Sequence, residues 1–168
     1  MKSVLISIKP KWCELIANGK KTIEVRKTKP KIETPFKCYI YCTKSPFELV
    51  RDKNGNITLL LRNKKADITD LEMLSGKVIG EFVCDEILQI IPPYFNAHFS
   101  VRVGCALRYD ELCGYLEDKG GYGWHISDLK IYDKPKELSE FRKCEMPTGL
   151  RYENDKITRP PQSWCYVE

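Results

Sequence analysis

The chain has 168 residues, with 28 Lys and Arg against 23 Asp and Glu, and a formal net charge of +5. This length predicts one domain over residues 1–168, large enough to bury a core without metal or disulfides. The sequence contains neither an apolar run long enough to cross a bilayer nor a signal peptide. A cytoplasmic protein with no membrane partner and with reduced cysteines is therefore expected.

The first part of the chain predicts a strand, a short helix and a second strand. Residues 4–9 alternate as a strand does, and Pro10 suits the first turn of a helix that Gly19 would end. Residues 22–26 alternate again. One face of that strand carries Thr22, Glu24 and Arg26, and the other carries Ile23 and Val25. The pattern directs Lys20 or Lys21 and the two charged strand residues to one side.

The remaining elements are mostly strands separated by turn residues. Strands are expected at 36–42, 78–84, 86–91, 122–132 and 164–167, and a helix is expected at 109–119. Asn54-Gly55 predicts a hairpin between 48–51 and 57–61, interpreted as an insertion at about 44–62. Residues 94–104 are expected to form a loop. This mostly antiparallel order suits a closed or partly closed small barrel.

The opening unit carries a family resemblance. The run Ser-Ile-Lys-Pro-Lys at 7–11, followed by the motif Gly-x-Lys-x-x-Glu-x-Arg at 19–26, resembles the ASCH domain. Gly-Trp-His-Ile at 123–126 and Pro-Pro-Gln-Ser-Trp at 160–164 are similar to its phage and prophage-type members. The resemblance implies an α+β fold: a small, mostly antiparallel PUA-like β-barrel of five to seven strands with two or three short helices. It also implies kinship with RNA-binding modules.

The motif provides the main site candidate, a polar cleft for RNA or a modified nucleotide. Cations would hold phosphates and aromatic rings would stack bases. The expected ligand-binding residues are Ser7, Lys9, Lys20, Lys21, Glu24, Arg26, Trp124 and His125. The alternative for the charged residues is a surface ion pair. For Trp124 the alternative is a place in the core, and for His125 it is a structural or merely exposed position.

Enzymatic alternatives use the same cleft, with Lys21 and Glu24 as the catalytic residues. One branch of the family cleaves single-stranded RNA without a metal, and Lys21, Glu24 and His125 could supply the acid and base groups. Another branch hydrolyses the amide of an acetylated cytidine with a Lys and a Thr on the motif strand. Glu24 occupies the position of that threonine, which argues against the amidohydrolase. A protein-interaction module of phage origin is a third possibility.

Neither a cofactor nor a metal site is expected. Cys38 and Cys42 lie in one predicted strand, whereas structural zinc sites bring together close pairs from tight turns. The other cysteines are scattered along the chain, so buried free thiols are expected.

Overall fold

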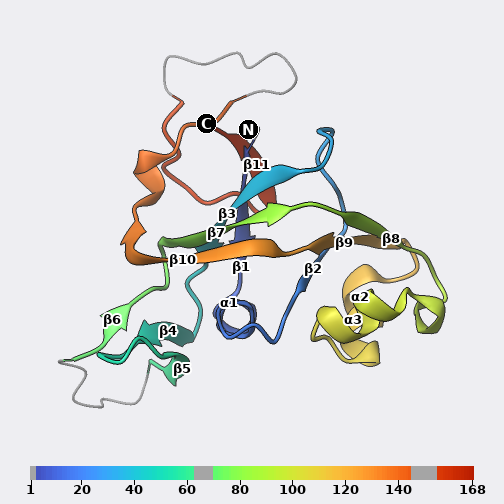
Figure 1. Ribbon diagram of the computed structural model, residues 1–168, viewed down its shortest axis with the longest axis horizontal. Helices are drawn as coiled ribbons and strands as arrows, with labels where there is room; N and C mark the ends of the chain where they lie inside the picture. The colour runs from blue at the N-terminus through green and yellow to red at the C-terminus, as the bar shows by residue number, and fades with distance from the viewer. Residues whose placement is uncertain (1–2, 63–69, 145–154) are drawn as a thin grey trace.

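The computed structural model describes residues 3–62, 70–144 and 155–168 of the chain (Figure 1). In these ranges it contains eleven strands, three α-helices and two 3-10 helices. In chain order they are β1 (Ser3–Ile8), α1 (Pro10–Ala17), β2 (Ile23–Arg26), β3 (Phe36–Cys42), β4 (Phe47–Arg51), β5 (Ile57–Leu61), β6 (Glu72–Met73), β7 (Val78–Cys84), β8 (Ile87–Ile90), η1 (Tyr94–Asn96), α2 (Phe99–Gly104), α3 (Tyr109–Leu116), β9 (Gly121–His125), β10 (Ser127–Lys136), η2 (Leu138–Glu140) and β11 (Trp164–Val167).

The strands form three sheets. The largest has the order β10-β7-β3-β1-β11, and the two smaller ones have the orders β2-β9-β8 and β5-β4-β6. Only β1 and β3 pair in parallel among the described strand pairs. The fold is therefore α+β and mostly antiparallel, as the sequence predicted. Within the described ranges, strand pairing leaves the sheets separate and does not close a barrel.

Strand β1 is the centre of the molecule because both of its faces are buried. Val4, Ile6 and Ile8 pack into the main core with residues of β3 and β7, including Phe36. Leu5, on the opposite face, belongs to a separate cluster on the other side of the same sheet. Successive side chains of a strand point to opposite faces of the sheet, so a strand that is buried on both faces needs apolar residues on each of them.

The short helices α2 and α3 cover one face of the sheet β2-β9-β8 (Figure 1). Their buried Val101, Leu112 and Leu116 pack with Ile23 and Val25 of β2. Gly104 permits this close approach, since a Cβ there would lie 2.6 Å from Thr22 Oγ1. The Thr22 amide donates to the Gly104 carbonyl at 2.8 Å, which fixes the end of α2 beside the start of β2.

Two expectations need correction. Residues 94–104 are not a loop, because they contain η1 and α2. The sequence did not predict the helix because its apolar residues alternate with period two, which is the spacing of a strand; these residues are Phe99, Val101 and Val103. The stretch 122–132 is also divided into β9 and β10, which pair with different sheets.

The eleven strands of the described ranges exceed the five to seven that the resemblance implied. The stretch 122–132, expected as one strand, contributes to both β9 and β10, and the predicted hairpin forms a third sheet together with β6. Strands β4 and β5 pair antiparallel from Phe47↔Leu61 to Arg51↔Ile57, as Asn54-Gly55 indicated. The assignment of this hairpin as an insertion, like that of one domain, stays a prediction.

The buried thiols predict a loss of stability at alkaline pH. Burial raises the pKa of the Cys84 thiol from an ordinary value near 9 to about 12, and it also raises the pKa values of Cys13 and Cys38. Because the thiol pKa is higher in the folded state, the free energy of unfolding is unaffected by this group below about pH 9 and falls above it, where the unfolded chain ionises first. Between pH 8 and 10, the free energy of unfolding of the wild type should fall by about 1–2 kcal/mol more than that of Cys84→Ala.

Urea denaturation under reducing conditions at both pH values measures this difference. Cys113→Ala is the matched control, because Cys113 is only partly buried whereas Cys84 is fully buried. A wild-type stability that is unchanged at pH 10 would contradict the prediction.

Candidate ligand-binding site

A tight turn after α1 delivers Lys21 to the start of β2. Pro10 occupies the first turn of the helix, and Gly19 adopts a φ of +71° directly after it. The amides of Lys20 and Lys21 both donate to the Leu15 carbonyl, at 2.8 and 3.1 Å. These bonds provide donors for a backbone carbonyl at the end of the helix. They also reverse the chain direction, which the left-handed conformation of Gly19 allows.

Strand β2 separates its charged from its apolar side chains, as the alternation predicted. Ile23 and Val25 pack against α2 and α3, whereas Glu24 and Arg26 lie on the opposite face. Glu24 is paired in register with Trp124 of β9. The β2 backbone is thus held by a sheet while its charged face is directed toward β1 and α1.

Lys21, Glu24 and Arg26 form a buried ion cluster. Lys21 Nζ lies 3.4 Å from Glu24 Oε2, and Arg26 Nη2 lies 2.9 Å from Glu24 Oε1. The exposed fractions of the three residues are 2%, 5% and 7%, respectively. The charges are therefore not the solvated surface pair that was the alternative reading of the sequence.

Backbone carbonyls complete the coordination of both cations. Lys21 Nζ donates to the Cys105 carbonyl at 2.6 Å, and Arg26 Nη2 donates to the Ser7 carbonyl at 2.6 Å. Burying charge is costly unless it is paired and hydrogen-bonded, and this cluster meets that condition at nearly every atom. The exception is Arg26 Nε, a buried donor for which the described residues provide no acceptor.

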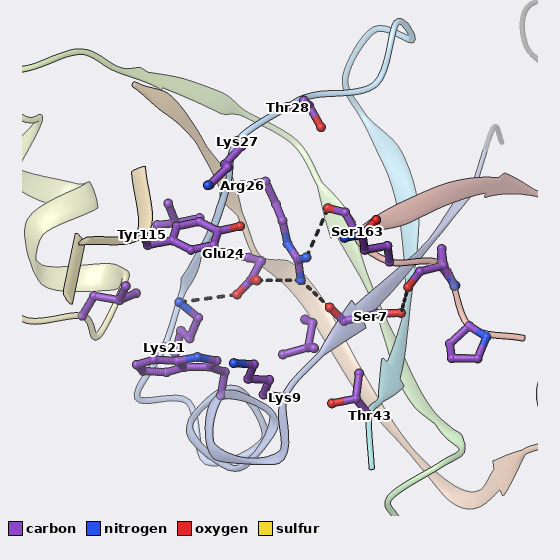
Figure 2. A pocket seen from close by; sticks show the side chains of 17 residues that line it. Ser7, Lys9, Lys21, Glu24, Arg26, Lys27, Thr28, Thr43, Tyr115 and Ser163 are labelled. Carbon is purple, nitrogen blue, oxygen red and sulfur yellow. Dashed lines mark hydrogen bonds and ion pairs between the residues drawn. The ribbon is translucent and has the colours of Figure 1, made fainter. Parts of the chain in front are cut away.

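The ion cluster lies at the base of a cavity of about 710 Å³ (Figure 2). The lining comes from β1, α1, β2 and α3, from the segments that follow β1, α1, β2 and β3, and from the segments that precede α3 and β11. Its residues are Ser7, Ile8, Lys9, Trp12, Lys21, Glu24, Val25, Arg26, Lys27, Thr28, Thr43, Leu107, Tyr115, Pro160, Pro161, Gln162 and Ser163. The volume is within the range of small-molecule and cofactor sites.

Residues 160–163 close one side of the cavity and are fastened to β1. The Ser7 amide donates to the Ser163 carbonyl at 2.9 Å, and Ser7 Oγ donates to the Pro161 carbonyl at 2.6 Å. Arg26 Nη1 also donates to Ser163 Oγ at 3.3 Å. Ser7 therefore shapes the cavity mainly by holding this segment in place.

The cavity has a surplus of positive charge and two aromatic walls. Lys9 and Lys27 are exposed and lie on opposite sides of the ion cluster in Figure 2. Lys27 Nζ lies 5.5 Å from the centroid of the Tyr115 ring, and Lys21 Nζ lies 5.2 Å from that of Trp12. Within the described part of the chain, four cations and one carboxylate therefore face a cavity that also has flat aromatic rings in its wall.

Tyr115 adds a hydroxyl donor to the cavity. Partial burial raises the pKa of its phenol; Glu24 adds to this effect and Arg26 opposes it. The phenol is therefore protonated at neutral pH and can donate a hydrogen bond to a ligand.

The structure brings together five of the eight ligand residues expected from the sequence: Ser7, Lys9, Lys21, Glu24 and Arg26. Lys20 is exposed and does not line the cavity. Trp124 is completely buried and packs edge-on against Phe36, with ring centroids 5.7 Å apart. His125 lies outside the lining, and its Nδ1 is 2.6 Å from Asp85 Oδ1.

Other lining residues were not among the expected site residues. Tyr115 has helical spacing with Leu112 and Leu116, which predicts burial, yet 38% of it is exposed. Residues 160–163 reach the cavity only through long-range pairing of β11 with β1. Lys27 and Trp12 belong to the run of lysines and aromatic residues around the motif, which indicates them as a possible phosphate contact and a possible stacking surface.

The described ranges contain neither a candidate metal centre nor a helix that could span a membrane. No three His, Cys, Asp or Glu side chains there gather as a set that could hold a metal ion. None of the helices in these ranges is both long and apolar enough to cross a membrane.

The α+β fold with a charged cavity beside its first strands defines a PUA-like protein with a candidate ligand site. A family model for the ASCH domain matches residues 6–92, which include the second half of β1 together with α1 and β2. The chain belongs to the ASCH domain family. The phage-type subdivision stays a prediction.

Solved structures of an ASCH protein from Zymomonas mobilis have a similar fold. Its crystal structure has a TM-score of 0.61 at 18% identity, covering 99% of this chain and 88% of that one. A tyrosine-to-phenylalanine mutant gives 0.61 at 18% over 100% and 91%, and a serine-to-alanine mutant gives 0.62 at 18% over 99% and 89%. No curated protein matches the chain.

Proposed function

We propose that this protein binds RNA or a modified nucleotide in the cavity above the buried ion cluster. The observation that carries the proposal is the combination of exposed cations with aromatic walls around a buried carboxylate. Nucleotide recognition needs these three features, because phosphates attract cations, bases stack on rings, and base N–H groups require acceptors. Membership of the ASCH family, which is related to RNA-binding modules, supports the same reading.

Each part of the cavity suits one part of a nucleotide. Lys9 and Lys27 are exposed and free to follow a phosphate, and Trp12 and Tyr115 provide flat surfaces for a base. Glu24 is held by its two cationic partners, so its remaining lone pairs are fixed in direction. A fixed acceptor discriminates between ligands better than a mobile one, since it does not reorient to suit a wrong partner.

Removing the two exposed lysines tests the proposal. We expect Lys9→Ala/Lys27→Ala to weaken binding of a labelled single-stranded RNA and to reduce the salt dependence of its affinity. For single strands, the slope of log K against log salt falls by about 0.7 for each lost phosphate contact. Fluorescence anisotropy at several salt concentrations measures both quantities.

The control is Lys134→Ala, which removes an exposed lysine of β10 that does not line the cavity. This variant should retain wild-type affinity and salt slope. Equal affinities for the wild type and the double variant would contradict the assignment of the cavity as the RNA site.

A metal-independent ribonuclease is the second candidate, favoured by the presence of acid, base and cationic groups in one cavity. RNA cleavage at a 2′-hydroxyl needs an acceptor for its proton, a donor to the leaving 5′ oxygen, and positive charge near the phosphate. Glu24, the protonated Tyr115 and the two cluster cations can supply these roles. Incubation of labelled RNA in EDTA, read on a denaturing gel, distinguishes cleavage from binding, and Tyr115→Phe then tests the donor.

The amidohydrolase reading lacks its nucleophile. Glu24 occupies the threonine position of that branch, and a carboxylate is a poor acyl acceptor from an amide. Thr22, the neighbouring hydroxyl, is exposed and does not line the cavity.

A further inference from the structure

A second hollow lies next to the cavity, on the layer formed by η1, α2 and α3. This aromatic groove has a volume of about 580 Å³. Its residues are Tyr94, Phe95, Phe99, Arg102, Val103, Cys105, Leu107, Tyr109 and Leu112. Leu107 lines both the groove and the cavity, and the carbonyl of Cys105 holds Lys21 of the ion cluster. The two sites are therefore adjacent.

The groove exposes apolar side chains that folding does not require there. Phe99 is 74% exposed, Phe95 is 59% exposed and Tyr109 is 55% exposed. The same layer already buries Val101 and Leu112 against the sheet, so its inward face is satisfied. A concentration of exposed aromatic rings on one short segment marks an interaction surface.

The charge of the groove favours a nucleic acid over an apolar peptide. Among the described residues that line it, Arg102 is the one charged residue, and it lies on α2 between Phe99 and the buried Cys105 in sequence. At the edge, Arg108 is exposed and its side chain pairs with Asp110. Arginine beside flat rings stacks on bases and attracts phosphate, which is how proteins bind single strands.

Resting on the function proposed above, we propose that the aromatic groove stacks the base of a nucleotide adjoining the one in the cavity. The ligand is then single-stranded RNA of at least two nucleotides, rather than a free nucleoside or mononucleotide. The cavity holds one unit beside the ion cluster, the strand passes Leu107, and the next base lies against Phe99 and Tyr109.

Binding of two probes to matched variants tests this inference. The probes are a fluorescently labelled octamer of uridylate and uridine monophosphate, the latter measured by calorimetry. We expect Phe99→Ala to weaken octamer binding about tenfold, since stacking on one aromatic side chain contributes on that order. Phe99→Tyr should preserve the affinity, and mononucleotide binding should be unchanged in both variants.

Phe99 is exposed, so its loss should leave the melting temperature unchanged, and Tyr109→Ala provides an independent second test of the groove. The control is Phe47→Ala, another exposed phenylalanine, on β4 and outside both sites. A wild type that binds the octamer no more tightly than the mononucleotide, or a Phe99→Ala variant with undiminished octamer affinity, overturns the groove while the cavity proposal stands. A wild type that binds neither probe overturns both.

Discussion

Glu24→Gln is expected to lower the free energy of unfolding by about 3–5 kcal/mol, the usual cost of breaking a buried ion pair from one side. Glu24 lies between two cations whose side chains are only 1% and 9% exposed. An amide of the same shape leaves Lys21 and Arg26 with like charges and no counter-ion in a site that water barely reaches. Urea denaturation at pH 7, under reducing conditions, measures the loss.

The control for this prediction is Glu33→Gln, an equally conservative change at an exposed position. It should alter stability by no more than about 0.5 kcal/mol. If Glu24→Gln changed the free energy of unfolding as little as the control does, the buried ion cluster would not depend on its carboxylate, which would contradict the prediction.

Trp124→Ala is expected to cost about 3–5 kcal/mol because it empties the centre of the main core. The indole is completely buried, and its ring lies 5.7 Å from Phe36 and 6.0 Å from Trp164 between centroids. Its Nε1 has no acceptor among the described residues, so packing rather than hydrogen bonding holds it. The midpoint of thermal or chemical unfolding reports the cost.

Trp12→Ala provides the contrast, since Trp12 is partly exposed and lines the cavity. We expect this variant to lose RNA affinity while losing less stability than Trp124→Ala. The opposite ranking, with Trp12 dominating stability and Trp124 dominating affinity, would return Trp124 to the ligand-binding role that the sequence suggested for it.

The sequence predicted the part of the site that depends on local geometry. Alternation along β2 placed Glu24 and Arg26 together, and Gly19 marked the turn that precedes Lys21. Whether these charges were exposed or buried did not follow, because burial depends on the carbonyls of Ser7 and Cys105, which come from other elements.

The rest of the site could not be predicted because it depends on packing between distant segments. Trp124 alternates like any strand residue, and only the packing of β9 over Phe36 decides that its ring belongs to the core. Tyr115 follows the spacing of a buried helix face, but α3 is short and turns this ring toward the cavity. The helix α2 was missed since its apolar residues alternate with period two.

The bond between Ser7 and Pro161 joins positions 154 apart in sequence. Bringing such distant positions together costs loop-closure entropy, which the contacts between the two segments must offset. The cavity wall therefore exists only where β1 and residues 160–163 are docked, and molecules in which they are apart lack a finished site. Ligand occupancy in turn favours the state in which both distant segments have met, because a ligand stabilises the form that binds it. In this protein, ligand binding and the joining of these two distant segments are therefore thermodynamically coupled.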